Sequence, residues 1–286
     1  MFGPNTYIKD KSSIQFSHRD KKFINLLKSV KNKFSQRFEL NDYDILFIPG
    51  SGTIGMESIF FSIKISINVI GNEGVFKKKW EEFNKIYKKN SSSNVDLFCA
   101  LETSNSSIFE KQSSIVDAIS SFPYYEIPKN TKIFATCSNK QIGSFPGLSI
   151  VAVRKDFWKN LESSDVFSYL NLRRYLDFGL INQTPSTTPT QIFEHLEKTI
   201  DSFSITKLRD KININSQKVV SALGKENITG ETQCPVITVK KDIIPKNIAQ
   251  KFNLYGLNTN SQYYQIFTYS CLDIDYDRFC EDIIKR

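Results

Sequence analysis

The alternation of strand-like and helix-like segments is the feature that most constrains how this chain folds. Between residues 21 and 154, short apolar runs such as "DILFIPG", "VDLFCAL" and "SIVAV" are separated by amphipathic stretches. One stretch, "KKFINLLKSVKNKFSQRF" over residues 21–38, places apolar side chains at steps of three and four and predicts a helix. Strands that alternate with helices predict an α/β fold around a mostly parallel sheet.

A second pattern begins near residue 188. A long helical region over residues 188–224 is followed by the strand-like runs "PVITVKK" and "YYQIFTYS" and by a terminal helix, "YDRFCEDIIKR". We therefore predict a large domain over residues 1–195 and a smaller C-terminal α+β domain over residues 196–286. The extreme N-terminus is a segment that can pack on the small domain. The length of 286 residues suits this division.

Composition argues against several classes of function. The chain carries 38 Lys and Arg beside 30 Asp and Glu, and the basic residues are spread along it. We therefore expect no nucleic-acid partner, although the excess charge favours anionic ligands. The five cysteines form no CxxC pair, so we expect neither a metal site nor a disulfide framework. The longest apolar run, over residues 59–70, is too short to span a bilayer. The composition is typical of a cytoplasmic protein without a membrane partner.

Polar groups follow several strand-like runs, at the positions where open α/β sheets bind ligands. "GSGT" at residues 50–53 opens a helix and suits a phosphate, although a plain strand-to-helix turn has the same composition. Thr103 and Ser104 follow "DLFCAL", where their hydroxyls suit a ligand oxygen or a cap. Asp117 ends another run, where it suits a cationic ring nitrogen or a turn.

Lys140 stands between the strand-like runs "KIFATC" and "LSIVAV", 23 residues after Asp117. An ammonium held between buried strands is costly and tends to lose its proton. A neutral, held amine is the group that lysine uses in covalent catalysis on carbonyl carbon. The alternative is a solvated loop lysine. A phosphate site, a carboxylate and a lysine at successive strand ends are more specific together than any one of them alone.

These stretches resemble the class V aminotransferases, which are fold-type I enzymes that use pyridoxal 5′-phosphate (PLP). Within that family the likeness is to the 2-aminoethylphosphonate–pyruvate transaminase branch. It is carried by "FGPNTY", "PGSGTIGMESI", "GNEGVF", "ALETSNS", "VDAISSF", "SNKQIGSFPGLSIVAVRKDF" and "TPSTTPTQIFEHLE". The resemblance implies a large domain with a seven-stranded type of sheet, a small C-terminal domain and a homodimer with shared active sites.

The resemblance also implies roles for individual residues. Lys140 would bind PLP covalently and shuttle the proton, and Asp117 would pair with the ring nitrogen. Either Cys137 or Ser138 would add to the phosphate site, and either Thr103 or Ser104 would contact the ring hydroxyl. The implied cofactor-binding residues are Ser51, Gly52, Thr53, Phe76, Thr103, Ser104, Asp117, Ser138, Lys140, Thr184 and Thr187. Thr184 and Thr187 would reach the cofactor of the partner subunit.

The substrate side departs from the family pattern. The family's C-terminal arginine strand corresponds to "YYQIFTYS", which places Gln265 where the arginine stands. Arg19 and Arg174 are the candidates to replace it, or are surface arginines. We expect a PLP-dependent transfer of an amino group from a small amine, resembling 2-aminoethylphosphonate, to a 2-oxo acid such as pyruvate. The alternatives are a PLP-dependent lyase or decarboxylase, and a non-catalytic binding protein with the same fold.

Overall fold

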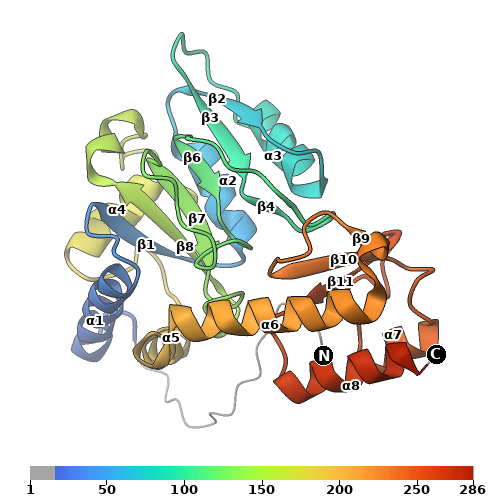
Figure 1. Ribbon diagram of the computed structural model, residues 1–286. Helices are drawn as coiled ribbons and strands as arrows, with labels where there is room; N and C mark the ends of the chain where they lie inside the picture. Colours follow the sequence, from blue (N-terminus) through green and yellow to red (C-terminus); the bar gives the residue numbers. More distant parts are fainter. Residues whose placement is uncertain (1–16, 286) are drawn as a thin grey trace.

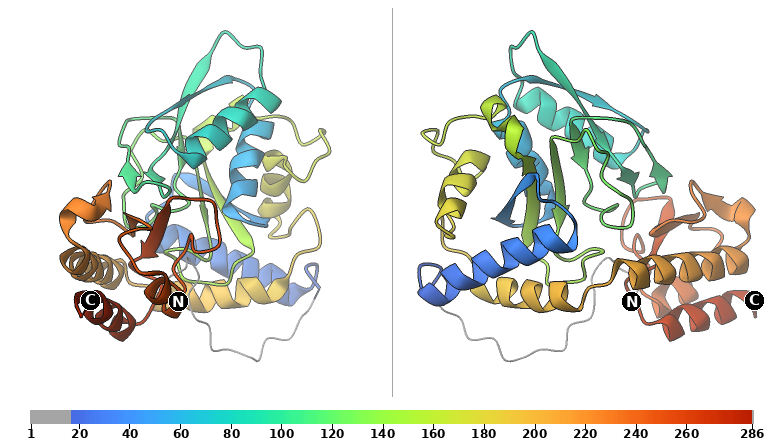
Figure 2. Two further views of the ribbon diagram at one scale, coloured as in Figure 1. Left: turned by 90° about the vertical axis from the view of Figure 1, so that its right-hand side faces the viewer. Right: turned by 60° about the vertical axis from the view of Figure 1, so that its left-hand side comes forward.

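The structure is a computed structural model that describes residues 17–285 (Figure 1). The stretch "FGPNTY" and the expected packing of the extreme N-terminus lie outside these residues. The chain forms a large unit around a central sheet and a smaller unit that lies beyond the lower end of that sheet in Figure 1. Figure 2 shows the same separation from two other sides.

The central sheet has six strands in the order β1-β8-β7-β6-β3-β2. The strands are β1 (Tyr43–Pro49), β2 (Ser66–Ile70), β3 (Asn94–Cys99), β6 (Ile115–Asp117), β7 (Ile133–Cys137) and β8 (Leu148–Arg154). Only β8 runs against its neighbours, since it is antiparallel to both β1 and β7, and the other pairs are parallel. The carboxyl ends of β6 and β7, which carry Asp117 and the approach to Lys140, are therefore adjacent.

Helices cover both faces of this sheet. On one face lie α1 (Lys21–Arg37) and α5 (Thr190–Ser202), which pack side by side in Figures 1 and 2. On the other lie α2 (Gly52–Ser62), α3 (Val75–Ile86) and α4 (Leu172–Leu180). A short 3₁₀ helix, η1 (Lys155–Asn160), follows β8. The apolar positions that predicted the first helix, Phe23, Leu27, Val30 and Phe34, are all buried against the sheet. Helical periodicity in the sequence thus marks the face that packs.

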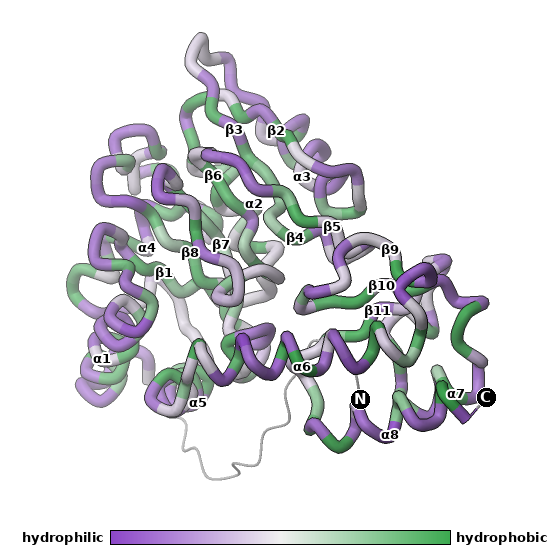
Figure 3. Tube along the Cα trace, in the orientation of Figure 1, coloured by the Kyte–Doolittle hydropathy of each residue, from purple (hydrophilic) through white to green (hydrophobic). Residues whose placement is uncertain are grey.

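The smaller unit is a three-stranded antiparallel sheet covered by helices. It contains α6 (Ile205–Leu223), η2 (Lys225–Asn227), β9 (Ile228–Thr229), β10 (Val236–Lys240), α7 (Lys246–Lys251), β11 (Tyr263–Phe267) and α8 (Asp273–Ile284). Figure 3 shows hydrophobic and hydrophilic residues alternating along α6, as expected for a helix with one buried side. A short hairpin of β4 (Leu101–Glu102) and β5 (Ser107–Ile108) faces this unit from the end of β3.

The predicted long helical region is two helices that meet at Phe203–Ser204. The first, α5, packs into the core of the large unit through Phe193, Leu196 and Ile200. The second, α6, packs into the core of the small unit. We therefore place the boundary between the units at residues 203–204 instead of 195–196, because the core contacts of α5 belong to the large unit.

The predicted fold class is confirmed as an α/β fold with a mostly parallel sheet and a smaller α+β unit. Within residues 17–285 the sheet has six strands, one fewer than the resemblance implied. The chain passes from β2 through α3 directly to β3, and these two strands pair in parallel. Over the same residues, no helix has the length and apolar character needed to cross a membrane.

Candidate active site

Lys140 lies in the turn that follows β7, next to the carboxyl end of β6. Its ammonium donates a hydrogen bond to the hydroxyl of Ser120 at 2.6 Å. The neighbouring Gln141 holds the same segment, because its amide nitrogen donates to the Ser120 carbonyl at 2.6 Å and its amide oxygen accepts from the Tyr124 N–H. The side chain of Lys140 is only partly buried. The amine is thus positioned by the chain and accessible to a ligand.

Asp117 is the buried acid of this site, with 3% of its surface exposed. One carboxylate oxygen accepts from the indole N–H of Trp80 at 3.0 Å, and the other accepts from the backbone N–H of Ile119 at 3.0 Å. Burial raises the pKa of Asp117, and the Ile119 N–H, the charge of Lys140, and the Cys99 and Trp80 side chains oppose that rise. The carboxylate is therefore fixed in orientation and responsive to a nearby cation.

Phe76 and Trp80 project from the same side of α3, four residues apart. Their ring centroids are 6.1 Å apart, and the Lys140 ammonium lies 5.9 Å from the Phe76 ring centroid. Trp80 is fully buried, whereas Phe76 keeps part of its surface exposed. Trp80 donates to Asp117 and Phe76 lies beside the Lys140 amine, so α3 contacts both the acid and the amine. The predicted grouping of Phe76, Asp117 and Lys140 is present in the structure.

The N-terminus of α2 borders the same group. A Cβ atom on Gly52 would lie 2.7 Å from the side chain of Ile119, so the first turn of α2 lies directly against the segment after Asp117. Ser51 is the N-cap residue, is exposed and makes no side-chain capping bond. The first N–H groups of a helix have no partner within it and attract anions. Ser51, Gly52 and Thr53 are therefore placed to bind a phosphate.

The Thr103–Ser104 turn connects this site to the small unit. The Gln265 side-chain amide donates to the Thr103 carbonyl at 2.7 Å, and both residues are buried. Ser104 donates its hydroxyl to the Glu102 carboxylate at 2.5 Å and accepts from the backbone N–H of Val75. The Ser104 hydroxyl is thus engaged within the protein, which leaves Thr103 as the better candidate of this pair for a ring hydroxyl.

Ser138 is fully buried in the turn that precedes Lys140. Its hydroxyl donates to the Phe145 carbonyl at 2.5 Å and contacts the Leu148 carbonyl at 3.3 Å. The hydroxyl therefore closes the turn instead of facing a phosphate. Cys137, the alternative, is also buried, and burial raises the pKa of its thiol. Neither side chain adds an evident anion donor.

The loop before α5 carries the two threonines assigned to a partner subunit. The Thr184 hydroxyl is buried and donates to the Ser186 carbonyl at 2.8 Å, whereas Thr187 is exposed. The Thr188 hydroxyl is buried and has no hydrogen-bond partner among the residues that the structure describes. Within residues 17–285, no hydrogen bond joins Thr184 or Thr187 to Lys140 of the same chain. Thr187 is thus available on the surface.

Arg174 does not lie near the site within one chain. The first residue of α4, Leu172, donates its N–H to the hydroxyl of Ser62 at 2.9 Å, and Ser62 is the last residue of α2. Gly52 is at the other end of this 11-residue helix, which is about 16 Å long. The Arg174 guanidinium lies over Phe167, 4.4 Å from its ring centroid. Within one chain, Arg174 therefore lies at the end of α2 that is far from Gly52.

Arg19 is also engaged away from the site. Its guanidinium donates to the Gln183 side chain at 2.5 Å and lies 5.8 Å from the Phe178 ring centroid. Among the described residues it touches neither Lys140 nor Gln265. Of the three residues predicted to bind substrate, only Gln265 contacts a segment of the site.

The structure adds three residues that the sequence did not single out. Trp80 orients Asp117, Ser120 holds the amine of Lys140, and Glu102 binds the first turn of α3. Trp80 follows Phe76 by four residues on a predicted helix, and this spacing alone indicates that the two side chains lie on the same side of it. Ser120 and Glu102 stood in stretches that resemble the family, but their partners are 20 and 26 residues away in sequence.

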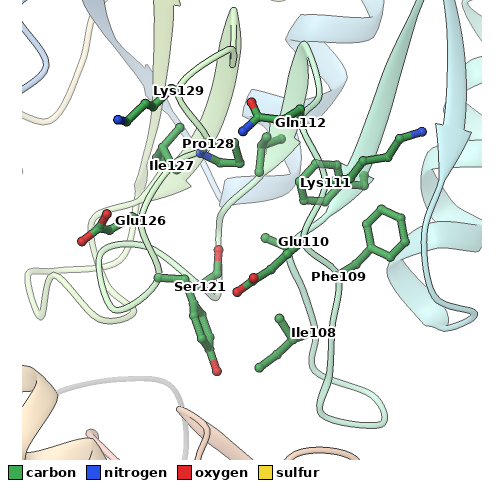
Figure 4. A pocket seen from close by; sticks show the side chains of 14 residues that line it. Ile108, Phe109, Glu110, Lys111, Gln112, Ser121, Glu126, Ile127, Pro128 and Lys129 are labelled. Carbon is green, nitrogen blue, oxygen red and sulfur yellow. The ribbon is translucent and has the colours of Figure 1, made fainter.

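A separate cavity of about 670 Å³ is shown in Figure 4. Its lining residues Phe98 and Val116 belong to the core under α1 and α5, whereas Trp80 belongs to the core on the other face of the sheet. Its floor is Phe98 and Val116, and its walls are the loops over residues 108–112 and 125–129. Figure 4 shows the Glu110 carboxylate directed into the space between these loops. None of the predicted site residues lines this cavity. The strand-end group around Lys140 is therefore the candidate active site.

Comparison with solved structures gives many matches. The three described next share 13% to 15% sequence identity with this chain. An aspartate aminotransferase from Thermus thermophilus superposes with a TM-score of 0.78 at 13% identity, covering 95% of this chain and 94% of that one. For an alanine–glyoxylate aminotransferase from Nostoc sp., the TM-score is 0.78 at 13% identity, with 96% and 89% covered. A PLP-bound phosphoserine aminotransferase from Trichomonas vaginalis gives 0.73 at 15% identity, with 95% and 90% covered.

These likenesses establish the fold. No protein-family model matches the chain, and no curated protein sequence does. The central sheet, the flanking helices and the small C-terminal unit together are those of solved aminotransferase structures. The predicted fold-type I architecture is confirmed.

Proposed function

We propose that this protein is a PLP-dependent aminotransferase. The observation that carries the proposal is the meeting of the Lys140 amine, the Asp117 carboxylate and the Phe76 ring beside the N-terminus of α2. The three residues and the N-terminus of α2 come from four separate segments, and a purely structural cluster has no need of a buried acid and a partly exposed amine. The similar structures are aminotransferases, which supports the same conclusion.

The residues present fit PLP. A phosphate matches the uncapped N-terminus of α2, and an aromatic ring matches the partly exposed face of Phe76. A carboxylate has about four acceptor positions. Asp117 receives two N–H donors, so it keeps capacity for a third donor such as a pyridinium N–H. The Lys140 amine is the group that reacts with the aldehyde of PLP.

Each residue then has a defined task. When bound, PLP supplies an electron sink for the carbanion formed at the substrate carbon. The Asp117 carboxylate keeps the ring nitrogen protonated, which its fixed orientation and burial favour. Phe76 covers one face of the ring and excludes water. The Lys140 Nζ would take the proton from the amine-bearing carbon of the donor and, in the second half-reaction, would deliver a proton to the carbon of the 2-oxo acid that receives the amino group.

The substrate that we propose is a small amine of the 2-aminoethylphosphonate type, with a 2-oxo acid such as pyruvate as acceptor. Arginine binds a carboxylate with two parallel donors, and glutamine cannot do so. Gln265 donates its amide to Thr103 and has no charge. With Arg174 distant and Arg19 engaged, a donor that lacks an α-carboxylate fits this site better than a common amino acid.

We further propose a homodimer, in which the exposed Thr187 and the adjacent Thr184 lie near the cofactor of the partner subunit. All five cysteines are free and buried, which suits a reducing compartment such as the cytoplasm. Gel filtration with light scattering tests the dimer. A monomer at micromolar concentration that still binds PLP tightly would refute a shared site.

The test of the function is to load the purified protein with PLP and add one amine at a time. We would compare 2-aminoethylphosphonate and phosphoethanolamine with alanine, glutamate and serine, and measure pyridoxamine phosphate by chromatography. We expect stoichiometric conversion with a carboxylate-free amine and slower conversion with the amino acids. Release of carbon dioxide or of an elimination product without pyridoxamine phosphate would instead indicate a lyase or decarboxylase. No reaction with any amine would refute an enzymatic role for these donors.

A further inference from the structure

Glu102, at the end of β4, is a buried acid to which the proposed function gives no task. Only 1% of its surface is exposed. A carboxylate withdrawn from water is costly unless donors surround it, so its partners reveal why it is tolerated.

All the donors around Glu102 come from two short segments. One carboxylate oxygen accepts from the backbone N–H groups of Phe76 at 2.8 Å and Lys77 at 3.3 Å. The other accepts from the N–H of Ser104 at 3.2 Å and from its hydroxyl at 2.5 Å. Phe76 and Lys77 belong to the first turn of α3, where N–H groups have no partner within the helix and negative charge is favourable.

The start of α3 is shaped to admit this carboxylate. Its N-cap residue is Gly74, which has no side chain to cap the helix. A Cβ atom at Gly74 would lie 2.1 Å from the Glu102 side chain, so only glycine leaves room for it. Glu102, which lies on strand β4, therefore takes the place of an N-cap side chain for α3. The residue that it binds directly, Phe76, is the one whose ring lies 5.9 Å from the Lys140 amine.

We infer that Glu102 is a positioning residue, which fixes the first turn of α3 and thereby holds the Phe76 ring against the bound cofactor. This role rests on the proposed function, because the ring needs a planar ligand to cover. Glu102 itself touches neither Lys140 nor Asp117 through any hydrogen bond in residues 17–285. It acts through the backbone of Phe76.

A double-mutant cycle tests this role. The variants are Glu102→Gln, Phe76→Leu and the two combined, and the dissociation constant for PLP is measured by equilibrium dialysis. Glu73→Gln is the matched control, because Glu73 precedes α3, is exposed and pairs with Lys77. We expect Phe76→Leu to weaken binding about fivefold and Glu102→Gln about threefold, with Glu73→Gln close to the unmodified protein.

The combined variant shows whether Glu102 affects PLP binding through Phe76 or independently of it. If Glu102 acts through Phe76, the combined loss equals that of Phe76→Leu alone. A combined loss of PLP affinity equal to the product of the two single losses would show that Glu102 acts independently of Phe76. With normal PLP binding by the unmodified protein, this result would overturn the role of Glu102 and leave the proposed function intact. Failure of the unmodified protein to bind PLP would refute the proposed function and this role with it.

A second measurement requires no cofactor. In the apoprotein, the amides of Phe76 and Lys77 should exchange hydrogen about tenfold faster in Glu102→Gln than in Glu73→Gln, since each loses a charged acceptor. Unchanged exchange at both amides would show that the carboxylate does not hold this turn, and would overturn the inference whatever the PLP measurements give.

Discussion

The two regions that meet at the candidate site differ in what their polar side chains bind. At the strand ends of the large unit, the Lys140 amine is partly exposed, and Asp117 keeps acceptor capacity beyond its two N–H donors. On β11 of the small unit, the Gln265 amide is buried and bound to the Thr103 carbonyl. The first region has groups available for a ligand, whereas the second uses its polar group to join the two units.

This difference separates the question of which cofactor the protein uses from the question of which substrate it accepts. Lys140, Asp117, Phe76 and the N-terminus of α2 fit the proposed cofactor, so its chemistry is expected to be retained. The side chain that the resemblance aligned with a substrate arginine serves the contact between units, so the substrate is expected to differ from that of a typical amino-acid aminotransferase. Variants in each region should therefore have effects of different size and kind.

The largest effect is expected at Lys140. Lys140→Ala removes both the covalent attachment point and the proton carrier, and we expect turnover to fall by about 10³-fold or more. Steady-state assays with the best donor measure the fall. The thermal unfolding of the apoprotein should change little, because within residues 17–285 the amine makes a single hydrogen bond, to Ser120. Turnover within tenfold of the unmodified protein would remove Lys140 from the mechanism.

Asp117→Asn should come next, with PLP retained and turnover reduced by about 10²-fold. An amide cannot hold the proton on the ring nitrogen as the buried carboxylate does, so the electron sink is weaker. The same assay, together with a PLP content measured by absorbance, separates loss of activity from loss of cofactor. Near-normal turnover in a folded variant would mean that Asp117 serves only as an acceptor for Trp80 and Ile119.

The pH dependence of PLP binding also tests whether Asp117 pairs with the ring nitrogen or serves only as an acceptor for Trp80 and Ile119. Burial raises the pKa of Asp117 in the folded protein. Below that pKa the carboxyl is neutral and cannot pair with a pyridinium, so PLP affinity should fall as the pH decreases through it. The fall should begin above the ordinary range of an aspartic acid, near 4. Asp117→Asn should lack this step, and an identical pH profile in both proteins would assign the step to another group.

Gln265 should show the smallest effect. Gln265→Leu removes one hydrogen bond to the Thr103 carbonyl, which also accepts from Thr238 at 3.4 Å. We expect a loss of about 1 kcal/mol in the free energy of unfolding and a change in turnover far smaller than at Lys140. Denaturant unfolding measures the change in the free energy of unfolding. A loss of turnover as large as that of Asp117→Asn, with little loss of stability, would place Gln265 on the substrate.

Local patterns predicted several of the helices and strands, and they drew attention to Asp117 and Lys140, whereas α4 and α7 were not predicted. The helix over residues 21–37 followed from the spacing of Phe23, Leu27 and Val30, and Asp117 and Lys140 followed from their places at strand ends. The Phe203–Ser204 break between α5 and α6 was missed, because both halves are amphipathic and only the two cores distinguish them.

Contacts between distant segments could not be predicted. Glu102 binds the backbone N–H of Phe76, a group that every residue except proline carries, so the identity of Phe76 does not reveal the contact. Arg174 was placed near the site because its segment resembles one near the family's site, yet α4 packs against the far end of α2. A residue at a strand end is positioned by the strand itself, whereas a residue on a packed helix is positioned by the tertiary fold.

The most direct measurement of the central claim is chemical trapping of the cofactor. The protein is loaded with PLP, reduced with borohydride, digested and mapped by mass spectrometry. We predict that the phosphopyridoxyl group is found on the peptide that contains Lys140, and that Lys140→Ala abolishes it. A label on another lysine, or no label although PLP is bound, would contradict the assignment of this strand-end group as the active site.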